Sequence, residues 1–296
     1  MLAVATHSGT FHADDVFAYA VLRAATRGEL TLTRSRDETV LAGADLLFDV
    51  GGVCDPERRR YDHHMRDKPL RADGIPFSSL GLIWQDFGRA ALETLCPGIS
   101  PVEADAVWRM LDQGLIRDID ISDNGAAPSG PAHVALLLES WNPFYTEPAR
   151  GETEAYLEAV EMAERILRRS CAQAHAAVQA TDMVAEAART AADPRILTLD
   201  IKVPWEDAVF DLALTAVLYI VRPAGAAWSV NAVPPQRGSF AQRKPLPDAW
   251  AGLRDAGMAA VTGVADATFC HPARFVCGAK SRAGALALAR LAVEAP

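Results

Sequence analysis

The alternation of apolar and polar positions predicts strands and helices in turn over the first fifty residues. Residues 2–5 and 46–50 are short apolar runs, a pattern typical of buried parallel strands. Between them, residues 14–25 carry apolar side chains at helical spacing, and Asp14 and Asp15 suit the positive end of a helix dipole. The order strand, loop, helix, strand, loop predicts an α/β doubly wound sheet, in which sites lie at the carboxyl ends of the strands.

The remainder of the chain predicts a long helical stretch and a second α/β region. Residues 152–191 contain no Gly or Pro and have apolar positions at helical spacing, so one long helix or two should form there. Residues 195–199, 226–233 and 267–276 are expected strands, and the apolar stretch 208–221 is expected to be a core helix. We therefore divide the chain into a catalytic domain (1–150), a helical connector (151–191) and a smaller α/β substrate-binding domain (192–296).

Composition narrows the classes of protein. Half of the 296 residues are hydrophobic and the net charge is −9, which argues against a protein that wraps long duplex DNA by neutralising phosphates. Five scattered cysteines without a CxxC pair favour free thiols in a reducing compartment. The apolar stretches are too short to span a bilayer, so we expect a cytoplasmic protein that does not insert in a membrane.

Four segments that follow apolar runs contain metal-type ligands. They are HSGTFHADD (7–15), DVGG (49–52), YDHH (61–64) and DISDNG (120–125). Imidazole and carboxylate groups without cysteine suit Mn²⁺, Mg²⁺ or Zn²⁺. In the third segment, one of the adjacent histidines can bind a metal while the other faces substrate, and Asp62 can fix an imidazole tautomer. These segments make the chain an enzyme candidate.

Each segment also has a purely structural interpretation. His7 could end a strand in the core, His12 could cap a helix, and Asp49 could cap a turn. The pair His63–His64 could be solvated in a polar loop. Clustering of the ligand types favours a metal site over these alternatives.

Three aspartates crowd the end of a predicted apolar helix. Asp118, Asp120 and Asp123 lie within six residues, where like charges and the negative end of the helix dipole are unfavourable. The alternatives are a cation that offsets the charge or solvated acids at a helix end.

The chain resembles the melanocyte-proliferating-gene family of predicted metal-dependent hydrolases, which is similar to the DHH phosphoesterase superfamily. The amino-terminal matches are THSGTFHADD, DVGGVCDP, RYDHH and IDISDNG. SSLGLIWQDFG, RKPLPDAWAGLRD and FCHPARFVCGAKSRAGALALA extend the match to nearly full length. The resemblance implies a DHH-like parallel-sheet domain followed by a smaller α/β domain, with two divalent ions, usually manganese, in the first domain.

Carried over position by position, the resemblance implies two sets of ligands that share Asp49. One ion would be held by His7, His12 and Asp49, and the other by Asp14, Asp49, His63 and Asp123. His64 would face the substrate and act in catalysis with Asp49 and Asp62. Residues behind the ligands would be Asp15, Asp62 and Asp120.

The carboxy-terminal motif departs from the family pattern. Arg274 and Cys277 replace two glycines of that pattern, Gly278 remains, and Cys54 stands where an aromatic residue is frequent. Candidate substrate-binding residues here are His271, Gly278, Lys280 and Arg282. The structural alternatives are that His271 closes a strand and that Lys280 and Arg282 form a cationic helix start.

The resemblance implies two-metal hydrolysis of phosphodiester bonds, with eukaryotic members similar to 3′-to-5′ RNA exonucleases. The expected partner is therefore an RNA or oligonucleotide end. Two alternatives remain: hydrolysis of a small phosphate ester or pyrophosphate-type substrate, and a metal-binding regulator or scaffold without turnover. A homodimer is one option for the oligomeric state.

Overall fold

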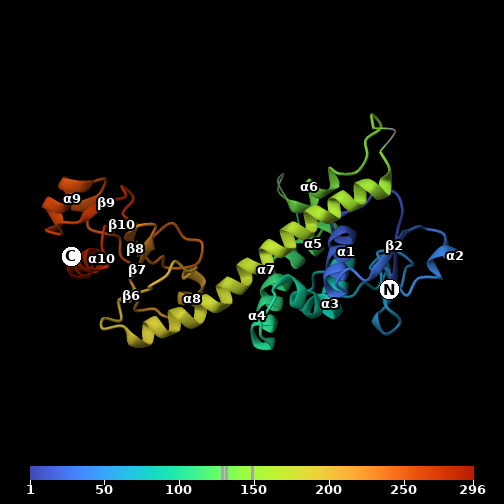
Figure 1. Ribbon diagram of the computed structural model, residues 1–296, viewed down its shortest axis with the longest axis horizontal. Coiled ribbons are helices and arrows are strands. Elements are labelled where there is room, and N and C mark those ends of the chain that lie inside the picture. Colours follow the sequence, from blue (N-terminus) through green and yellow to red (C-terminus); the bar gives the residue numbers. More distant parts are fainter. Residues whose placement is uncertain (128–129, 131–132, 148–149) are drawn as a thin grey trace. The chain divides into compact units, whose positions relative to one another are not determined.

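The computed structural model describes residues 1–127, 130, 133–147 and 150–296, and divides into two compact units. The first unit is Met1–His175 and the second is Ala176–Pro296 (Figure 1). A single helix, α7 (Glu152–Thr190), contributes residues to both units. Each unit contains one five-stranded sheet, which confirms the predicted α/β fold class. The assignment of the three segments 1–150, 151–191 and 192–296 as domains stays a prediction.

The first sheet has the strand order β2-β1-β3-β5-β4. β1 (Leu2–Thr6), β2 (Leu30–Arg34), β3 (Leu46–Phe48) and β5 (Arg60–Tyr61) are parallel, and the short β4 (Cys54–Asp55) pairs antiparallel with β5 at the edge. The strand β2 was not predicted, because its residues alternate between half-buried and exposed and lack a continuous apolar run. Parallel pairing brings the carboxyl ends of β1, β3 and β5 to one edge of the sheet.

Two helices of the first unit pack against each other. α1 (Ala13–Ala25) lies beside α3 (Ser79–Leu95) (Figure 1), and almost every side chain of α1 is buried. The unit also contains α2 (Glu38–Leu41), the 3₁₀ turn η1 (Pro56–Arg58), α4 (Pro101–Leu111), α5 (Arg117–Asp123) and α6 (Val134–Glu139).

The helical stretch that contains α4 and α5 is interrupted between these two helices. The five residues Asp112–Ile116 form a π-helical turn, and Gly114 has non-helical angles (φ −106°, ψ −107°). The apolar helix predicted here is therefore interrupted, and Asp120 and Asp123 lie on a separate short helix. Such π-turns are frequent at functional sites.

The second unit has a mostly antiparallel sheet of order β6-β7-β8-β10-β9. Its strands are β6 (Ile196–Thr198), β7 (Tyr219–Ala224), β8 (Ala227–Ala232), β9 (Ala267–Cys270) and β10 (Val276–Ala279). Only β6 and β7 are parallel. The helical elements are α8 (Glu206–Asp211), η3 (Asp248–Trp250), α9 (Asp255–Thr262) and α10 (Arg282–Glu294), and α10 packs against β7, β8 and β10.

Two predictions of secondary structure in the second unit were wrong. The stretch 208–221 is not one helix: α8 ends at Asp211, Ala213 adopts a left-handed conformation (φ 51°), and β7 begins at Tyr219. Tyr, Ile and Val at positions 219–221 favour a strand. The stretch 267–276 is not one strand, because the chain turns between β9 and β10, where Arg274 has a φ of 58°.

In the part of the chain that the structure describes, no helix combines the length and the apolar character that crossing a bilayer requires.

Candidate metal centre

The first turn of α1 presents several of the predicted ligands. His12 is the N-cap residue, and its backbone N–H donates to the Asp15 carboxylate at 3.0 Å. This contact fixes the start of the helix, so that the fully buried side chains of Asp14 and Asp15 lie in its first turn. His7, which directly follows β1, has its Nε2 atom 3.2 Å from Asp15 Oδ2. The loop 7–12 therefore brings the two imidazoles and the α1 carboxylates to one place.

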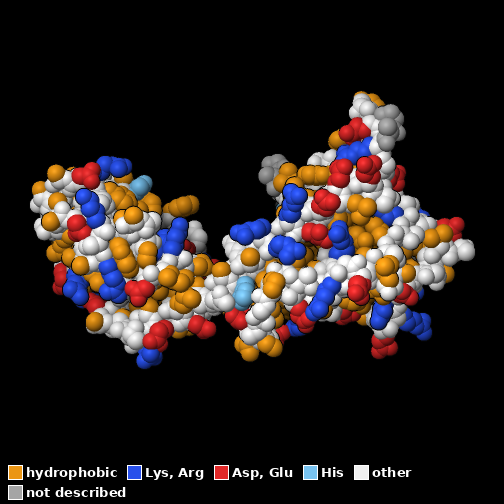
Figure 2. All heavy atoms as spheres, in the orientation of Figure 1, with side chains coloured by type: hydrophobic (Ala, Val, Ile, Leu, Met, Phe, Trp, Pro, Cys, Tyr) orange, Lys and Arg blue, Asp and Glu red, His pale blue; other side chains and the backbone are white. Residues whose placement is uncertain are grey.

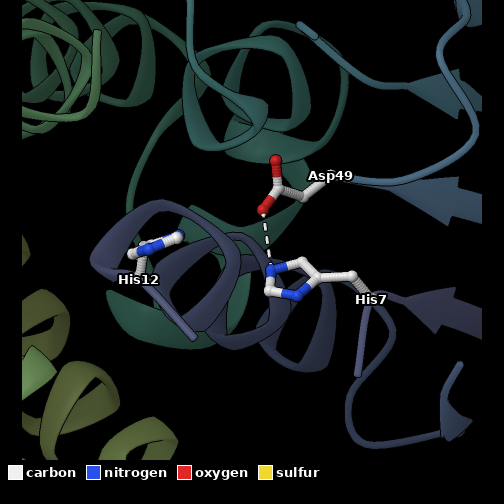
Figure 3. A group of neighbouring side chains, drawn as sticks. All are labelled: His7, His12 and Asp49. Carbon is white, nitrogen blue, oxygen red and sulfur yellow. Dashed lines mark ion pairs between the residues drawn. The ribbon is translucent and has the colours of Figure 1, made fainter. Parts of the chain in front are cut away.

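Asp49 lies at the centre of the site. It follows β3 and has a φ of 55°, a left-handed conformation that costs a residue other than glycine about 1–3 kcal/mol. Its Oδ2 atom is 3.1 Å from His7 Nε2, and its Oδ1 atom is 3.2 Å from His63 Nε2. The two oxygens of one buried carboxylate thus face two different imidazoles. Figure 3 shows His7 and Asp49 pointing toward one another, with His12 at the start of α1 nearby.

His63 joins the second half of the cluster. It follows β5, and its Nε2 atom is 3.7 Å from Asp14 Oδ2 and 3.3 Å from Asp123 Oδ2. Asp123 is the last residue of α5 and keeps a partly exposed carboxylate. Together with Asp49, these residues surround a second point of convergence.

The ligand atoms of this cluster are close enough to share divalent ions. In three groups, ligand atoms lie within 4.8 Å of one another: His7, His12 and Asp49; Asp49, His63 and His64; His12, Asp14 and Asp123. Asp14 Oδ1, His63 Nδ1 and Asp123 Oδ2 are buried without a hydrogen-bond partner. Buried charged atoms need an ion partner or a metal, and imidazole with carboxylate is the donor set of Mn²⁺, Mg²⁺ and Zn²⁺ sites. The residues present therefore fit divalent ions.

The carboxylates of the cluster repel one another. Burial raises the pKa of Asp14 well above its usual value, and the neighbouring Asp49 and Asp123 raise it further. Burial also raises the pKa values of Asp15 and Asp123. For Asp49, burial alone would raise the pKa, but contacts with two imidazoles outweigh burial and hold it well below the usual range. Asp49 is therefore the permanent anion at the centre.

The two buried imidazoles supply the compensating charge when no metal is bound. Burial alone would lower the pKa of His7, but its contacts with Asp15 and Asp49 outweigh burial and raise the pKa to about 10. The pKa of His63 is raised in the same way by Asp49 and Asp123. His7 is thus an imidazolium ion at neutral pH in the metal-free protein, and the shift at His63 favours protonation in the same direction. A proton on a ring nitrogen must leave before that nitrogen can bind a metal.

Asp62 organises the loop after β5, and its role in supporting a metal ligand stays a prediction. Its Oδ1 atom accepts hydrogen bonds from the backbone N–H groups of His63 (2.7 Å) and His64 (3.0 Å), and lies 2.8 Å from His64 Nδ1. The His64 side chain is 60% exposed, and it lines a cavity of about 320 Å³ together with His7, His12 and Asp49. His64 is thus oriented by Asp62 and open to a ligand.

Asp120 belongs to a neighbouring network with its own cation. Arg71 Nε donates to Asp120 at 2.6 Å, and Arg71 Nη1 donates to Asp112 at 2.9 Å. Ser78 donates to Asp120 through its backbone N–H (2.9 Å) and its hydroxyl (2.6 Å). A Cβ atom at Gly81 would lie 2.5 Å from the Asp120 carboxylate, so glycine is needed there. The cation that offsets Asp120 is therefore an arginine.

Sequence reasoning missed two residues of the site. The Ser79 hydroxyl lies within hydrogen-bonding distance of Asp49 Oδ1 (3.0 Å), and the Ser79 N–H donates to Asp14 Oδ2 (3.3 Å). Arg36 lines the same cavity as His64, and its Nη2 atom is 3.2 Å from His7 Nδ1. Ser79 is in the SSLGLIWQDFG segment, which matches the family pattern but was given no functional role from the sequence. Arg36 offered no signal beyond its charge.

The carboxy-terminal candidates all lie in the second unit. His271 is exposed, and its Nδ1 accepts a hydrogen bond from Ala273 N. Arg282 begins α10 and is paired with Asp200 at 3.3 Å. Lys280 is exposed after β10, and Gly278 is buried within that strand.

The departures from the family pattern have structural explanations. Arg274 keeps the left-handed conformation that glycine favours and forms an ion pair with Asp248 at 2.7 Å. Cys277 is fully buried in the hydrophobic core under α10, and the half-buried Cys54 lies in the edge strand β4.

The fold and the cluster define a two-unit α/β protein with a site suited to divalent ions at the carboxyl ends of parallel strands. The family model MYG1_exonuc, described as "Uncharacterised protein family (UPF0160)", matches residues 3–293. The chain belongs to this family. MYG1 protein C694.04c of Schizosaccharomyces pombe is 32% identical over 100% of this chain and 98% of its own length. The human MYG1 exonuclease is 30% identical over 97% of this chain and 84% of its own length.

A comparison with solved structures finds a crystal structure of RecJ from Thermus thermophilus in complex with Mn²⁺. The identity is 17% and the TM-score is 0.28, with 100% of this chain and 52% of the RecJ chain covered. The chain's family is shown by the family model and by the sequence relatives.

Proposed function

We propose that this protein is a metal-dependent nuclease that hydrolyses phosphodiester bonds, and that it removes nucleotides from the 3′ end of RNA or of short oligonucleotides. The observation that carries the proposal is the position of Asp49, whose two carboxylate oxygens face His7 on one side and His63 on the other at 3.1 and 3.2 Å. A carboxylate with this arrangement can bridge two cations. The exonuclease names of several relatives support nucleic acid as the substrate.

The proposed ligand sets follow the two halves of the cluster. His7, His12 and Asp49 would hold one ion. Asp14, Asp49, His63 and Asp123 would hold the other. Mn²⁺ is the first choice, with Mg²⁺ and Zn²⁺ as alternatives that suit the same donors. Asp15 Oδ2 lies 3.2 Å from His7 Nε2, the same ring atom that faces Asp49, and would add negative charge beside the ion that His7 would hold.

Bound divalent ions would supply an activated water and neutralise charge on the phosphoryl group. The chain's own residues prepare the site for this chemistry. Asp62 fixes the His64 ring through its Nδ1 atom, which leaves Nε2 of the exposed ring to face the substrate. In its protonated form, with Nδ1–H donating to Asp62, His64 would donate a hydrogen bond from Nε2 to the phosphate or to the leaving oxygen. The Ser79 hydroxyl, 3.0 Å from Asp49 Oδ1, would keep the Asp49 carboxylate oriented toward both sets of ligands.

A small phosphate ester is the second candidate substrate. The cavity beside His7 and His64 measures about 320 Å³, at the low end of the range for small-molecule sites. Turnover of pyrophosphate or a mononucleotide ester without cleavage of any oligonucleotide would favour this alternative. Metal binding without hydrolysis of any phosphoester would favour a regulatory role instead.

The test is a hydrolysis panel with metal-depleted protein to which Mn²⁺, Mg²⁺ or Zn²⁺ is added. Substrates are 5′-labelled single-stranded RNA and DNA, dinucleotides, a nitrophenyl ester of a nucleotide, and pyrophosphate. The variant Asp49→Asn removes the bridging charge, and asparagine tolerates the left-handed conformation of this position. Asp118→Asn is the matched control, because Asp118 is exposed on α5.

We expect Mn²⁺-dependent shortening of RNA from its 3′ end by the wild-type protein. Asp49→Asn should reduce turnover by more than about 100-fold, beyond the 10- to 100-fold effect of residues that only support metal ligands. Asp118→Asn should stay within about twofold, as a surface change does. Full Mn²⁺-dependent turnover by Asp49→Asn would refute the bridging role.

A further inference from the structure

The two faces of the second sheet have different partners. Strand residues alternate between faces, and the register of β7, β8 and β10 identifies which residues share a face. One face contributes to the hydrophobic core against α10. Its residues are Tyr219, Val221, Val230, Ala232, Cys277 and Ala279.

The opposite face carries polar groups in a row across three strands. Arg222 of β7 is directly opposite Ser229 of β8, and Ser229 is directly opposite Gly278 of β10. Asn231 is on the same face, two residues after Ser229, and its side chain donates to the Ser229 hydroxyl at 2.9 Å. A Cβ atom at Gly278 would lie 2.8 Å from the Phe269 ring, so this ring occupies the space that a side chain at position 278 would need. The face presents a guanidinium and polar groups.

A cavity of about 580 Å³ lies over this face. Its walls come from the polar row, from the residues that begin α8, and from the loop that follows β8, and include Arg222, Asn231, Glu206, Phe240, Gln242 and Phe275. This volume lies within the usual range of small-molecule sites. All of these residues belong to the second unit, so the cavity does not depend on the position of the first.

Arg222 has no ion-pair partner among the described residues. Its Nε atom is buried without a hydrogen-bond partner, whereas Arg237 nearby is paired with Asp207. Burial lowers the pKa of Arg222, which reflects the cost of holding its charge away from water. A guanidinium in this position gains most from an anion that binds two of its N–H groups, and phosphate has the right geometry.

Aromatic side chains stand at the same cavity. Phe240 is 97% exposed and Phe275 is 41% exposed, an unusual state for large apolar rings. On the visible surface of the second unit, hydrophobic side chains and Lys or Arg side chains are interspersed (Figure 2). Exposed rings beside a cation are typical of surfaces that stack the bases of single-stranded nucleic acid. Asn231, Gln242 and Glu206 supply donors and acceptors for base edges.

We propose that this cavity binds one nucleotide of a single-stranded nucleic acid, with Arg222 on its phosphate and Phe240 stacked on its base. The inference rests on the proposed function for the choice of nucleic acid as the ligand, and it names residues of the second unit that would hold the substrate. Arg282 and Lys280, the phosphate contacts predicted from the sequence, stay predictions, and Arg222 is proposed in addition to them.

The test measures binding of a fluorescein-labelled eight-nucleotide RNA, and of DNA of the same sequence, to the full chain in EDTA, where no turnover occurs. The variants are Arg222→Gln and Phe240→Ala. Matched controls are Arg254→Gln, which removes an exposed charge of the second unit outside the cavity, and Tyr145→Ala, which removes a ring that is 97% exposed in the first unit. Circular dichroism verifies folding, and Phe240→Ala removes a side chain too exposed to support the core.

We expect each cavity variant to weaken binding about tenfold, as loss of one stacked base or one phosphate contact does. Arg222→Gln should also lower the slope of log K against log salt by about 0.7. Phe240→Ala should leave that slope unchanged, and both controls should match the wild type. Preference for RNA over DNA would indicate contact with the ribose hydroxyl.

Wild-type affinity in both cavity variants, or failure of the wild-type protein to bind either oligonucleotide, would overturn the inference. The two proposals fail separately. Binding through the cavity without hydrolysis under any metal would refute the nuclease and leave the nucleotide site. Hydrolysis by a protein whose affinity for the oligonucleotides is unchanged by Arg222→Gln and Phe240→Ala would refute the nucleotide site and leave the nuclease.

Discussion

Two groups of buried carboxylates lie side by side in the first unit, and they differ in the cation that accompanies them. In what we call the arginine network, Arg71 pairs with Asp112 and Asp120. In the histidine–aspartate cluster (His7, His12, Asp14, Asp49, His63 and Asp123), the partners of the carboxylates are imidazoles, and the carboxylates raise the pKa values of His7 and His63. An arginine cannot give up its proton, whereas an imidazole can.

The difference in cation gives the two groups different roles, one structural and one suited to binding metal. The arginine network contains its own permanent cation, so its carboxylates need no metal. In the histidine–aspartate cluster, protons bound to imidazole offset the charge of the carboxylates, and divalent ions can replace these protons. The acidic residues of α5 divide between the two groups: Asp120 faces Arg71 and Asp123 faces His63. Substitution of Asp120 should therefore mainly reduce stability, whereas substitution of Asp123 should mainly reduce metal binding.

The largest expected effect is on stability. Asp120→Ala leaves Arg71 buried with only one partner, and breaking a buried pair in this way costs about 3–5 kcal/mol. Asp123→Ala removes one of several mutually repelling carboxylates and should cost less than about 1 kcal/mol in EDTA. Urea unfolding of both variants, followed by tryptophan fluorescence and circular dichroism, measures the difference. Equal losses would show that the two groups are energetically alike.

The next effect is the response to metal. A ligand present at 100 times its Kd stabilises the folded state by about 2.7 kcal/mol, and we expect Mn²⁺ to stabilise the wild-type protein by this amount at that concentration. Asp123→Ala should lose most of the gain at the same Mn²⁺ concentration. Asp118→Ala, which alters an exposed residue of the same helix, should keep it. Thermal unfolding with and without EDTA provides the measurement, and an undiminished gain in Asp123→Ala would remove that residue from the ligands.

The sequence predicted the histidine–aspartate cluster because its ligands are dense and local. His7, His12 and Asp14 lie within eight residues, and Asp62, His63 and His64 are consecutive. Histidines and aspartates grouped this closely in a sequence are typical of a functional site. The short apolar runs before Asp49 and His7 also predicted where the strands would end. Residue identity and one rule about parallel sheets therefore indicated where a metal site would form, whereas the division of the ligands into two sets came from the family resemblance.

The arginine network could not be predicted in the same way. Arg71 and Asp120 are 49 positions apart, and each residue alone is an ordinary charged residue. The second unit shows the same limit. Arg222, Ser229 and Gly278 form one row only through the register of β7, β8 and β10, and the strand β7 lies in a stretch whose apolar run predicted a helix. Long-range pairing, which no local pattern encodes, decides these features.

The smallest of the three effects concerns the serine pair that joins the two groups. Ser78 donates to Asp120 in the arginine network, and Ser79 lies 3.0 Å from Asp49 in the histidine–aspartate cluster. Ser79→Ala should lower Mn²⁺ affinity or turnover by about 10- to 100-fold, as loss of a partner behind a metal ligand does, with little change in stability. Ser78→Ala should instead cost about 1–3 kcal/mol, because it removes a partner of a buried carboxylate, and should leave Mn²⁺ affinity near the wild-type value. Calorimetric titration with Mn²⁺ and urea unfolding on both variants separate the two outcomes. If each serine moved both readouts equally, the boundary between the structural and the metal-binding carboxylates would not lie between these adjacent residues.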